Sequence, residues 1–306
     1  MSRILVIGSL NIDIVQQVPR LPLLGETLAA TSLQVFNGGK GNNQAAAAAL
    51  LGQNVAIGGM VGADEFGKRL KDRLHSMGVD VGMVKQSSQP TGTAMILVLP
   101  DGENVIVISK GANDLVDVES AQTWVENLDE GDFLLCQLET PVDAVRAAFV
   151  RARHRAATTI LDPAPMQPLP PELLRATTII TPNQDEAARL LGRTGAIEEL
   201  NDARDAASAI HQMGPETVII KLDKLGCVMA DGRHVSHFPA LPVRAVDTTA
   251  AGDCFNGALA VALAEGLAMT DAVRFANAAA ALSVTRAGAV DSMPSRAALD
   301  LFRNRH

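Results

Sequence analysis

The chain has 306 residues, 47% of them hydrophobic, and a formal net charge of -8. A chain of this length can bury a large core, either as one large domain or as two ordinary ones. The acidic balance argues against nucleic-acid and membrane-surface partners, because both would require a basic face to meet phosphates. No apolar run reaches the ~18 residues of a membrane-spanning helix, and the first residues show no signal-peptide pattern, so we expect a cytoplasmic protein.

The first predicted element is the apolar run Ile4–Ile7, which has the length and composition of a buried strand. Residues 31–36 follow as a half-buried antiparallel strand. Residues 93–109 form a second stretch of this kind, folded into a hairpin at Pro100, Asp101 and Gly102. We expect these antiparallel stretches to form a small sheet that projects from the main body.

Between them, GGKGNNQAAAAALLG at 38–52 joins a polar, glycine-rich loop to an alanine-rich helix. Asn42 or Asn43 is a good N-cap, and Gly52 suits the residue just past the helix C-terminus. The loop would then offer an ammonium group, two amides and unpaired backbone N–H groups, a set suited to a polyhydroxylated or anionic ligand. The alternative is a flexible helix entry with a solvated lysine.

Further short apolar runs, not alternating with polar residues, recur through the chain between helical stretches such as 142–153 and 186–191. Runs of this kind are typical of parallel strands that are buried on both faces. They lie at Phe133–Cys136, Thr158–Leu161, 178–180 and 218–220. The sequence therefore predicts an α/β fold with a mostly parallel central sheet.

The cysteines are Cys136, Cys227 and Cys254, an odd number of residues spread widely along the chain. This spacing favours buried, reduced thiols over a disulfide framework or a zinc site. The six histidines form no metal-binding motif.

A second glycine-rich helix start lies in AVDTTAAGDCFNGALAVALAEG at 245–266. Small residues there would let the backbone N–H groups from Ala250 to Asp253 converge on one anion, with support from the helix dipole. The alternative is that Asp253 only stabilises a helix N-terminus, a common role worth ~1 kcal/mol. Neither a P-loop motif nor a GxGxxG fingerprint is present in the chain.

Taken together, the two glycine-rich motifs resemble those of the ribokinase family of carbohydrate kinases, and the similarity runs along the whole chain. The further matching motifs are GSLNID at 8–13, GET at 25–27, GMVGADEFG at 59–67, QLETP at 137–141 and TPNQDEA at 181–187. The resemblance implies a ribokinase-like three-layer fold in which a small β-sheet lid covers the sugar. We expect one domain over 1–306, with lid strands from about 12–36 and 90–110.

The activity implied by the resemblance is ATP-dependent phosphorylation of D-ribose at its 5-hydroxyl, giving ribose 5-phosphate and ADP. Alternatives are a kinase for deoxyribose, another sugar or a nucleoside, although one Trp and no Tyr offer little to stack an adenosine base. A sugar-binding or regulatory protein on a kinase scaffold is a different class, and it would predict loss of Asp253 or its loop.

By resemblance, Asp253 is the catalytic base, and Ala250, Ala251 and Gly252 form an anion hole. The residues implied for sugar binding are Asn11, Asp13, Gly39, Lys40, Asn43, Glu139 and Asp253. Carboxylates accept hydrogen bonds from hydroxyls, whereas amides and an ammonium group donate to them, so this set can satisfy a polyol in both directions.

The nucleotide site implied by the resemblance comprises Asn183, Glu186, Lys221, Lys224, Gly226, Gly252 and Asn277. Asn183 and Glu186 match a motif linked to Mg²⁺ through water, but they also have the spacing of a helix capping box. The segment KLDKLG departs from the family pattern, because Asp223 stands where glycine is usual and Lys224 where a small polar residue is common.

The resemblance also implies an activating K⁺ ion, and the predicted lid itself leads us to expect a homodimer formed through it. The cation positions are Asp247, Thr249, Ser283, Arg286, Gly288 and Ser292, several of them acting through backbone carbonyls. A small exposed sheet with free edges favours pairing with its own copy.

Overall fold

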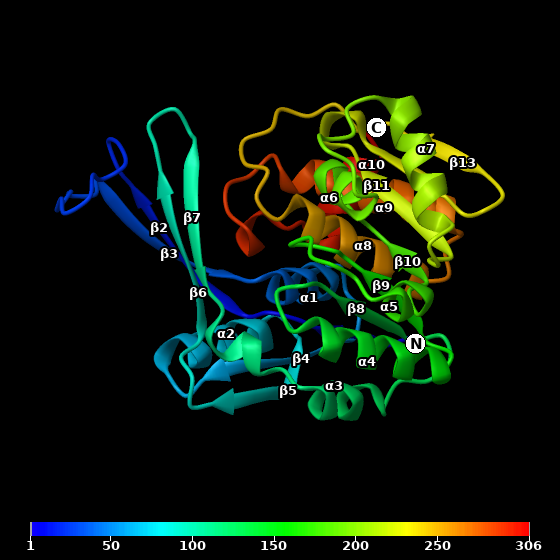
Figure 1. The fold of residues 1–306 in the computed structure, drawn as a ribbon, viewed down its shortest axis with the longest axis horizontal. Coiled ribbons are helices and arrows are strands. Elements are labelled where there is room, and N and C mark those ends of the chain that lie inside the picture. The colour runs from blue at the N-terminus through cyan, green and yellow to red at the C-terminus, as the bar shows by residue number, and fades with distance from the viewer. Residues whose placement is uncertain (1, 306) are drawn as a thin grey trace.

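Helices cover both faces of one nine-stranded sheet in the computed structural model, which describes residues 2–305 (Figure 1). The strand order is β13-β12-β11-β10-β9-β8-β1-β4-β5, and all neighbours are parallel except β11–β12 and β12–β13. The strands are β1 (Ile4–Ile7), β4 (Val55–Gly62), β5 (Asp80–Ser87), β8 (Phe133–Cys136), β9 (Thr158–Leu161), β10 (Ile179–Ile180), β11 (Thr217–Lys221), β12 (Cys227–Ala230) and β13 (Val235–Phe238).

The core has two parts because the side chains of β1 alternate between the two faces of the sheet. Ile4 and Val6 pack under one helical layer, and Leu5 and Ile7 pack under the other. The first layer contains α1 (Lys40–Leu50), α2 (Glu65–Ser76), α8 (Ala251–Ala264), α9 (Met269–Ser283) and α10 (Arg296–Arg303). The second contains α3 (Val118–Val125), α4 (Val142–His154), α5 (Pro171–Arg175), α6 (Gln184–Leu190) and α7 (Leu200–His211).

Short 3₁₀ turns complete the body at η1 (Gly111–Leu115), η2 (Asp223–Leu225) and η3 (Val290–Ser292). The three cysteines are all free and buried, as the sequence predicted. Among the described residues, none of the helices has the length and apolar character needed to cross a bilayer.

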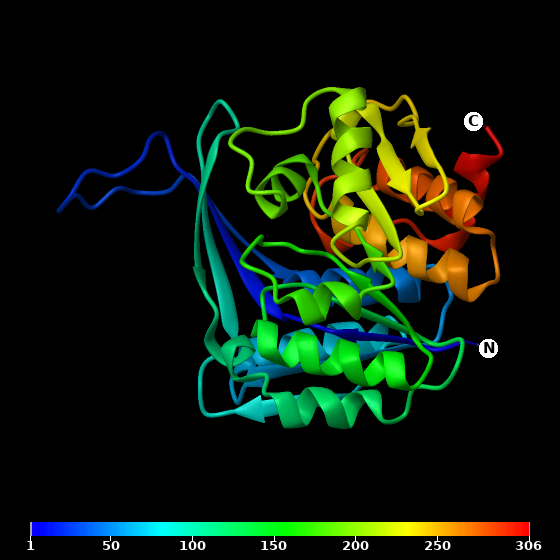
Figure 2. The ribbon, with the colours of Figure 1, turned by 45° about the vertical axis from the view of Figure 1, so that its right-hand side comes forward.

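A separate four-stranded sheet, which we call the lid, projects from the body (Figures 1 and 2). Its strands are β2 (Asn11–Gln17), β3 (Ser32–Gly38), β6 (Gly92–Val98) and β7 (Asn104–Ser109), in the order β3-β2-β6-β7. β2 starts at the buried Asn11 and ends at the exposed Gln17, so one strand runs from the core into the lid. The predicted hairpin is confirmed, because residues 99–103 connect β6 to β7.

The apolar runs identified in the sequence are all strands of the central sheet, which confirms the α/β class. The predicted N-cap at Asn42 or Asn43 is wrong, because α1 begins at Lys40 with Gly39 in the N-cap position and no side-chain cap. Gly39 has a φ of 91°, and a Cβ atom there would lie 2.7 Å from the backbone nitrogen of Asn11. Gly52 follows the helix with a φ of 94°, as predicted.

Candidate active site

The N-termini of α1 and α8 lie together at the carboxyl ends of the parallel strands, which is where α/β sheets bind ligands. A cavity of about 970 Å³ opens beside them. Its lining includes Lys40, Asp162, Asn183, Glu186, Lys221, Asp223, Lys224, Gly226, Ala250, Ala251, Gly252, Asp253 and Asn277. The fold thus brings residues from most of the chain's length to one site.

The α8 N-terminus exposes backbone donors to this cavity. Ala250 has a left-handed conformation with a φ of 58°, and no side chain caps the helix. The N–H groups of Gly252 and Asp253 have no hydrogen-bond partner within residues 2–305, whereas that of Ala251 donates to the Thr248 carbonyl at 3.3 Å. The positive end of the helix dipole therefore faces the cavity with free donors, which suits an anion.

Asp253 lies in the first turn of α8, but its carboxylate makes its hydrogen bonds with α1. Oδ2 accepts from Asn43 Nδ2 at 3.0 Å and Oδ1 accepts from Gln44 Nε2 at 3.0 Å. Burial raises the pKa of Asp253 to about 6; Lys40 and the two amides lower it, and Asp162 raises it. The interpretation of Asp253 as a simple helix-stabilising residue does not account for this buried, amide-held carboxylate.

Lys40 supplies a half-buried cation near several carboxylates. Burial lowers the pKa of its ammonium group, but the charges of nearby carboxylates, chiefly Asp253 and Asp162, outweigh burial and raise the pKa above its ordinary value. Its backbone N–H also donates to Glu139 Oε2 at 3.1 Å, and the Ser9 hydroxyl donates to the same oxygen. Glu139 is thereby tied to the loop at the start of α1.

The base of the lid contributes Asn11 and Asp13 from β2. Asp13 lies directly against Gly38, where a Cβ atom would be 2.1 Å from Oδ2, so only glycine fits beside it. Burial, with the charges of Glu139 and Asp253, raises the pKa of Asp13 to about 6. The Asn11 amide oxygen accepts from Asn113 Nδ2 at 2.7 Å, which fixes its orientation.

On the opposite side of Asp253, Asn183 and Glu186 form the capping box that their spacing predicted, at the start of α6. Glu186 is nevertheless buried at the cavity wall, and burial raises its pKa, with Lys221 opposing the rise. Lys221 pairs with Asp162 at 3.0 Å. The capping role and a place in the site are therefore compatible.

The far end of the cavity is built on tight backbone turns. Gly226 has a φ of 88°, and a Cβ atom there would meet the Phe238 carbonyl at 2.0 Å. The Asn277 amide donates to the carbonyls of Phe238 and Pro239 at 3.3 Å each. Asp223 adopts a left-handed conformation with a φ of 52°, which agrees with a position where glycine is usual.

The residues of the expected cation site lie in two segments that Asp247 joins: the loop with Asp247 and Thr249, and residues 283–292, which run from the end of α9 to η3. Its Oδ1 accepts from the Thr249 N–H at 2.9 Å and its Oδ2 accepts from the Gly288 N–H at 2.8 Å. Burial opposes ionisation, but these hydrogen bonds outweigh it and lower the pKa of Asp247. The Arg286 N–H donates to the Ser283 carbonyl at 3.1 Å, and the buried Ser292 hydroxyl donates to the Ala289 carbonyl at 2.8 Å.

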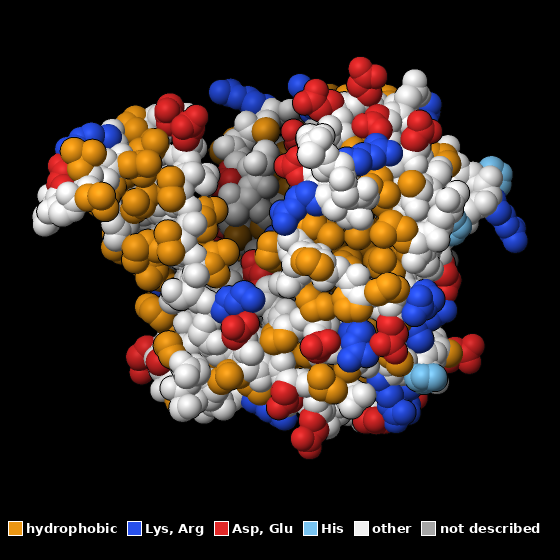
Figure 3. Space-filling view, viewed as in Figure 1, with side chains coloured by type: hydrophobic (Ala, Val, Ile, Leu, Met, Phe, Trp, Pro, Cys, Tyr) orange, Lys and Arg blue, Asp and Glu red, His pale blue; other side chains and the backbone are white. Residues whose placement is uncertain are grey.

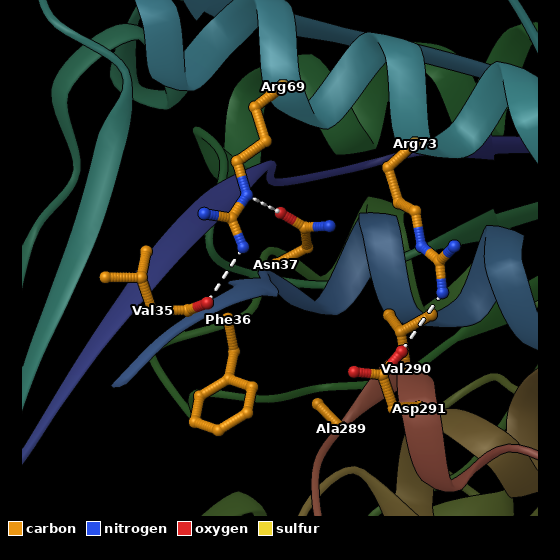
Figure 4. A pocket seen from close by; sticks show the side chains of 8 residues that line it. All are labelled: Val35, Phe36, Asn37, Arg69, Arg73, Ala289, Val290 and Asp291. Carbon is orange, nitrogen blue, oxygen red and sulfur yellow. Dashed lines mark hydrogen bonds and ion pairs between the residues drawn. The ribbon is translucent and has the colours of Figure 1, made fainter. Parts of the chain in front are cut away.

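A smaller cavity of about 320 Å³ separates the lid strand β3 from η3 and α2 (Figure 4). Arg69 crosses from α2 to β3, donating to Asn37 Oδ1 at 3.0 Å and to the Val35 carbonyl at 2.8 Å. Arg73 pairs with Asp291 at 3.1 Å. The Arg69 contacts hold the root of the lid against the body, and the Arg73–Asp291 pair joins α2 to η3 within the body. The outer lid presents apolar side chains beside a hollow (Figure 3).

Sequence reasoning named no role for Gln44, Gln137 or Asp162, although all three are buried at the site. The first two lie within the recognised motifs, and Asp162 directly follows the strand β9, at the end where site residues gather. Position at the carboxyl end of a strand was therefore an available signal. The hydrogen bonds that join the three residues could not be predicted from the sequence.

Comparison with known proteins agrees with this geometry. The family model described as pfkB family carbohydrate kinase matches residues 1–296. The chain is 41% identical over 292 residues to a ribokinase of Haemophilus influenzae, covering 95% of each chain. It is also 38% identical over 296 residues to a ribokinase of Bacillus subtilis, covering 97% of each.

Solved structures give the same result. A ribokinase of Arabidopsis thaliana complexed with ribose and ATP superposes with a TM-score of 0.92 at 34% identity, covering 99% of both chains. A ribokinase of Thermotoga maritima superposes with a TM-score of 0.90 at 36% identity, covering 99% of this chain and 100% of the other. The chain thus has the ribokinase fold and belongs to the pfkB family of carbohydrate kinases, which are phosphotransferases.

Proposed function

We propose that this protein phosphorylates D-ribose at the 5-hydroxyl with ATP, giving ribose 5-phosphate and ADP. The observation that carries the proposal is the place of Asp253. It is a buried carboxylate between a polar set suited to a sugar and a cavity lined by helix N–H donors, Lys221 and Asn183. The ribokinase relatives and the complex of one of them with ribose and ATP support ribose as the substrate.

In the proposed reaction, Asp253 accepts the proton of the 5-hydroxyl as the hydroxyl oxygen bonds to the γ-phosphorus. The bond from that phosphorus to its bridging oxygen breaks, and ADP leaves with the electron pair. Phosphoryl transfer is loose, so the position of the carboxylate matters more than its basicity. We assign the anion hole for the charge on the transferred group to Ala250, Ala251 and Gly252. The N–H of Gly252 is free within residues 2–305, whereas that of Ala251 would exchange its 3.3 Å bond to the Thr248 carbonyl for one to the phosphate.

Sugar recognition is assigned to Asn11, Asp13, Gly39, Lys40, Asn43 and Glu139. Asp13 and Glu139 accept from sugar hydroxyls, and Lys40 and Asn43 donate to them. Asn11, Gly39 and Asn43 are buried, and Asp13, Lys40 and Glu139 are half-buried. This burial favours a ligand that becomes enclosed when the lid covers it.

Nucleotide binding is assigned to Asn183, Glu186, Lys221, Lys224, Gly226, Gly252 and Asn277, which all line the cavity. Within residues 2–305, no cluster of three or more His, Cys, Asp or Glu side chains forms a ready metal cage. Mg²⁺ fits the site all the same, because it is commonly held by one or two carboxylates with substrate phosphates. Glu186 is the carboxylate we assign to it, and bound Mg²⁺ would neutralise phosphate charge.

We also assign an activating K⁺ site to Asp247, Thr249, Ser283, Arg286, Gly288 and Ser292. Asp247 is ionised and its carboxylate joins the two segments. Together with the carbonyl and hydroxyl oxygens around it, this carboxylate forms an oxygen donor set suited to a hard cation. These segments adjoin Thr248 and Val284 at the cavity wall. Equal rates in K⁺ and in a large organic cation at matched ionic strength would contradict this assignment.

We propose that the chain acts as a single domain, that it works in the cytoplasm and that two copies pair through the lid. The buried free thiols suit a reducing compartment. Every residue of the lid strand β7 is exposed, including Val105, Ile106, Val107 and Ile108. Exposed apolar strands with free edges are usually covered by a partner.

The test is a panel of pentoses, hexoses and nucleosides with ATP and Mg²⁺, scored for ADP release. Fastest turnover with D-ribose supports the proposal. A preference for deoxyribose, another sugar or a nucleoside would support the kinase activity but contradict D-ribose as the substrate. Tight sugar binding without ADP release from any compound would instead favour a sugar-binding or regulatory protein.

A further inference from the structure

We propose that Gln44 is a positioning residue that holds the carboxylate of Asp253 in place and connects it to the Asp162–Lys221 ion pair. This inference rests on the proposed role of Asp253 as the base. The Gln44 amide nitrogen donates to Asp253 Oδ1 and to Asp162 Oδ2, both at 3.0 Å. One primary amide has two hydrogens, so both are used.

Gln137 fixes which way the Gln44 amide points. Gln137 Nε2 donates to Gln44 Oε1 at 2.7 Å. If the Gln44 amide turned over, its oxygen would face two carboxylates and its NH₂ group would face another NH₂ group, so only one orientation satisfies the network. Gly8 makes room for Gln137, because a Cβ atom there would lie 2.1 Å from Gln137 Oε1.

Burial makes this arrangement rigid. Gln44 is 1% exposed, Gln137 is fully buried and Asp162 is 2% exposed, so water does not compete for these hydrogen bonds. Without the bridging amide, Asp253 would keep only the donor of Asn43 and Asp162 only that of Lys221 among the hydrogen bonds within residues 2–305, and no shared donor would join the two carboxylates. Gln44 therefore both orients Asp253 and separates it from a like charge.

The bridge also connects the two halves of the site. On the sugar side, Asp253 is held by Asn43 as well as by Gln44. On the nucleotide side, Asp162 holds Lys221, whose Nζ would lie 3.2 Å from a Cβ atom at Gly252. One buried amide thus sets the base and the cation at the α8 N-terminus relative to each other.

The test compares Gln44→Met on α1 with Asn256→Leu, which replaces a fully buried side-chain amide on α8. The side-chain amide of Asn256 has no hydrogen-bond partner among residues 2–305, so its loss should leave kcat unchanged. Gln44→Met should lower kcat by about 10- to 100-fold, the usual cost of a misplaced catalytic group. KM for ribose and for ATP should stay within about threefold of the parent, because Gln44 is 1% exposed and is not among the residues that line the cavity.

Two further variants keep the proposal falsifiable if Gln44→Met folds poorly. Gln137→Met removes only the orienting donor and should lower kcat by about 3- to 10-fold, the scale of one hydrogen bond. In an Asp253→Asn background, Gln44→Met should have no further effect on the residual rate, because its partner has already lost its function.

Normal kcat in both glutamine variants would overturn the proposal. An equal loss of kcat in Asn256→Leu would also overturn it. A further loss of the residual rate when Gln44→Met is added to Asp253→Asn would do the same. Failure of the proposed function is a distinct result, since Asp253→Asn alone would then remain active. An inactive Asp253→Asn with a normal Gln44→Met overturns only the role of Gln44.

Discussion

Replacing Asp253 by Asn should lower kcat and, at the same time, raise the free energy of unfolding. The substitution keeps the size of the side chain but removes the proton acceptor and one of two hydrogen-bond acceptors. If Asp253 is the base, kcat should fall by roughly 10² to 10⁴, or about 3 to 5 kcal/mol of barrier. ATP affinity should change little, because the nucleotide contacts lie on the other side of the site.

Stability should rise, since the buried charge is unfavourable to the native state. A pKa raised by burial from 3.8 to about 6 corresponds to about 3 kcal/mol of destabilisation at neutral pH. Asn would place an NH₂ group against that of Asn43, a conflict of about 1 kcal/mol. The Asn43 amide can turn to relieve it, because within residues 2–305 its only other side-chain hydrogen bond is a 3.3 Å one from Asn42.

The expected net gain is about 1 to 2 kcal/mol, or a Tm increase of about 1.5 to 3 °C at pH 8 for a chain of 306 residues. The gain should vanish as the pH falls from 6 toward 4, because Asp253 of the parent then becomes neutral on its own. Asp117→Asn is the matched control. Asp117 caps α3 by accepting from the Ser120 N–H at 2.7 Å, on the other face of the sheet, so this variant should keep its kcat.

The measurements are kcat, ATP affinity and Tm from one preparation of each variant. Turnover within about threefold of the parent, with normal melting and ATP binding, would show that Asp253 is not the base. A Tm lowered by more than about 5 °C would refute the argument that its buried charge is unfavourable.

Raised pKa values near 6 for Asp253 and Asp13 predict that kcat/KM for ribose is highest above that pH and falls steeply below it, as both carboxylates gain protons; a flat profile from pH 8 to 5 would contradict this. Asp13→Ala should weaken sugar binding by ~1.5 to 3 kcal/mol, the scale of a charged hydrogen bond, so an unchanged KM for ribose would remove Asp13 from the site. Light scattering at micromolar concentration should give about twice the 32.1 kDa of one chain, and a monomer mass would rule out the lid dimer. Ile106→Asp on the lid should yield monomers, whereas Leu301→Asp, at an equally exposed apolar position on α10, should not.

Local sequence patterns were enough to predict the central strands β1, β8, β9, β10 and β11 and much of the candidate site, whereas β4, β5, β12 and the strand order were not predicted. Runs such as Ile4–Ile7 and Phe133–Cys136 are apolar throughout because both faces of a parallel strand are covered, and this pattern is local. The glycine-rich motifs likewise identified Lys40 and Asp253, since small residues before a helix produce free N–H groups wherever the helix lies.

The tertiary structure decided how these groups are used. Asn43 was predicted as an N-cap from its neighbours in sequence, yet its amide donates to Asp253, 210 residues away. Gln44, for which the sequence predicted no role, likewise donates to a distant residue, Asp162, which lies 118 residues away. A side-chain donor bonds to an acceptor that lies within hydrogen-bond distance. The packing of α1 against α8 and the sheet sets those distances. A helix-capping rule considers only residues within one turn of the helix end. It therefore could not predict that Asn43 would donate to a buried carboxylate from a distant part of the chain.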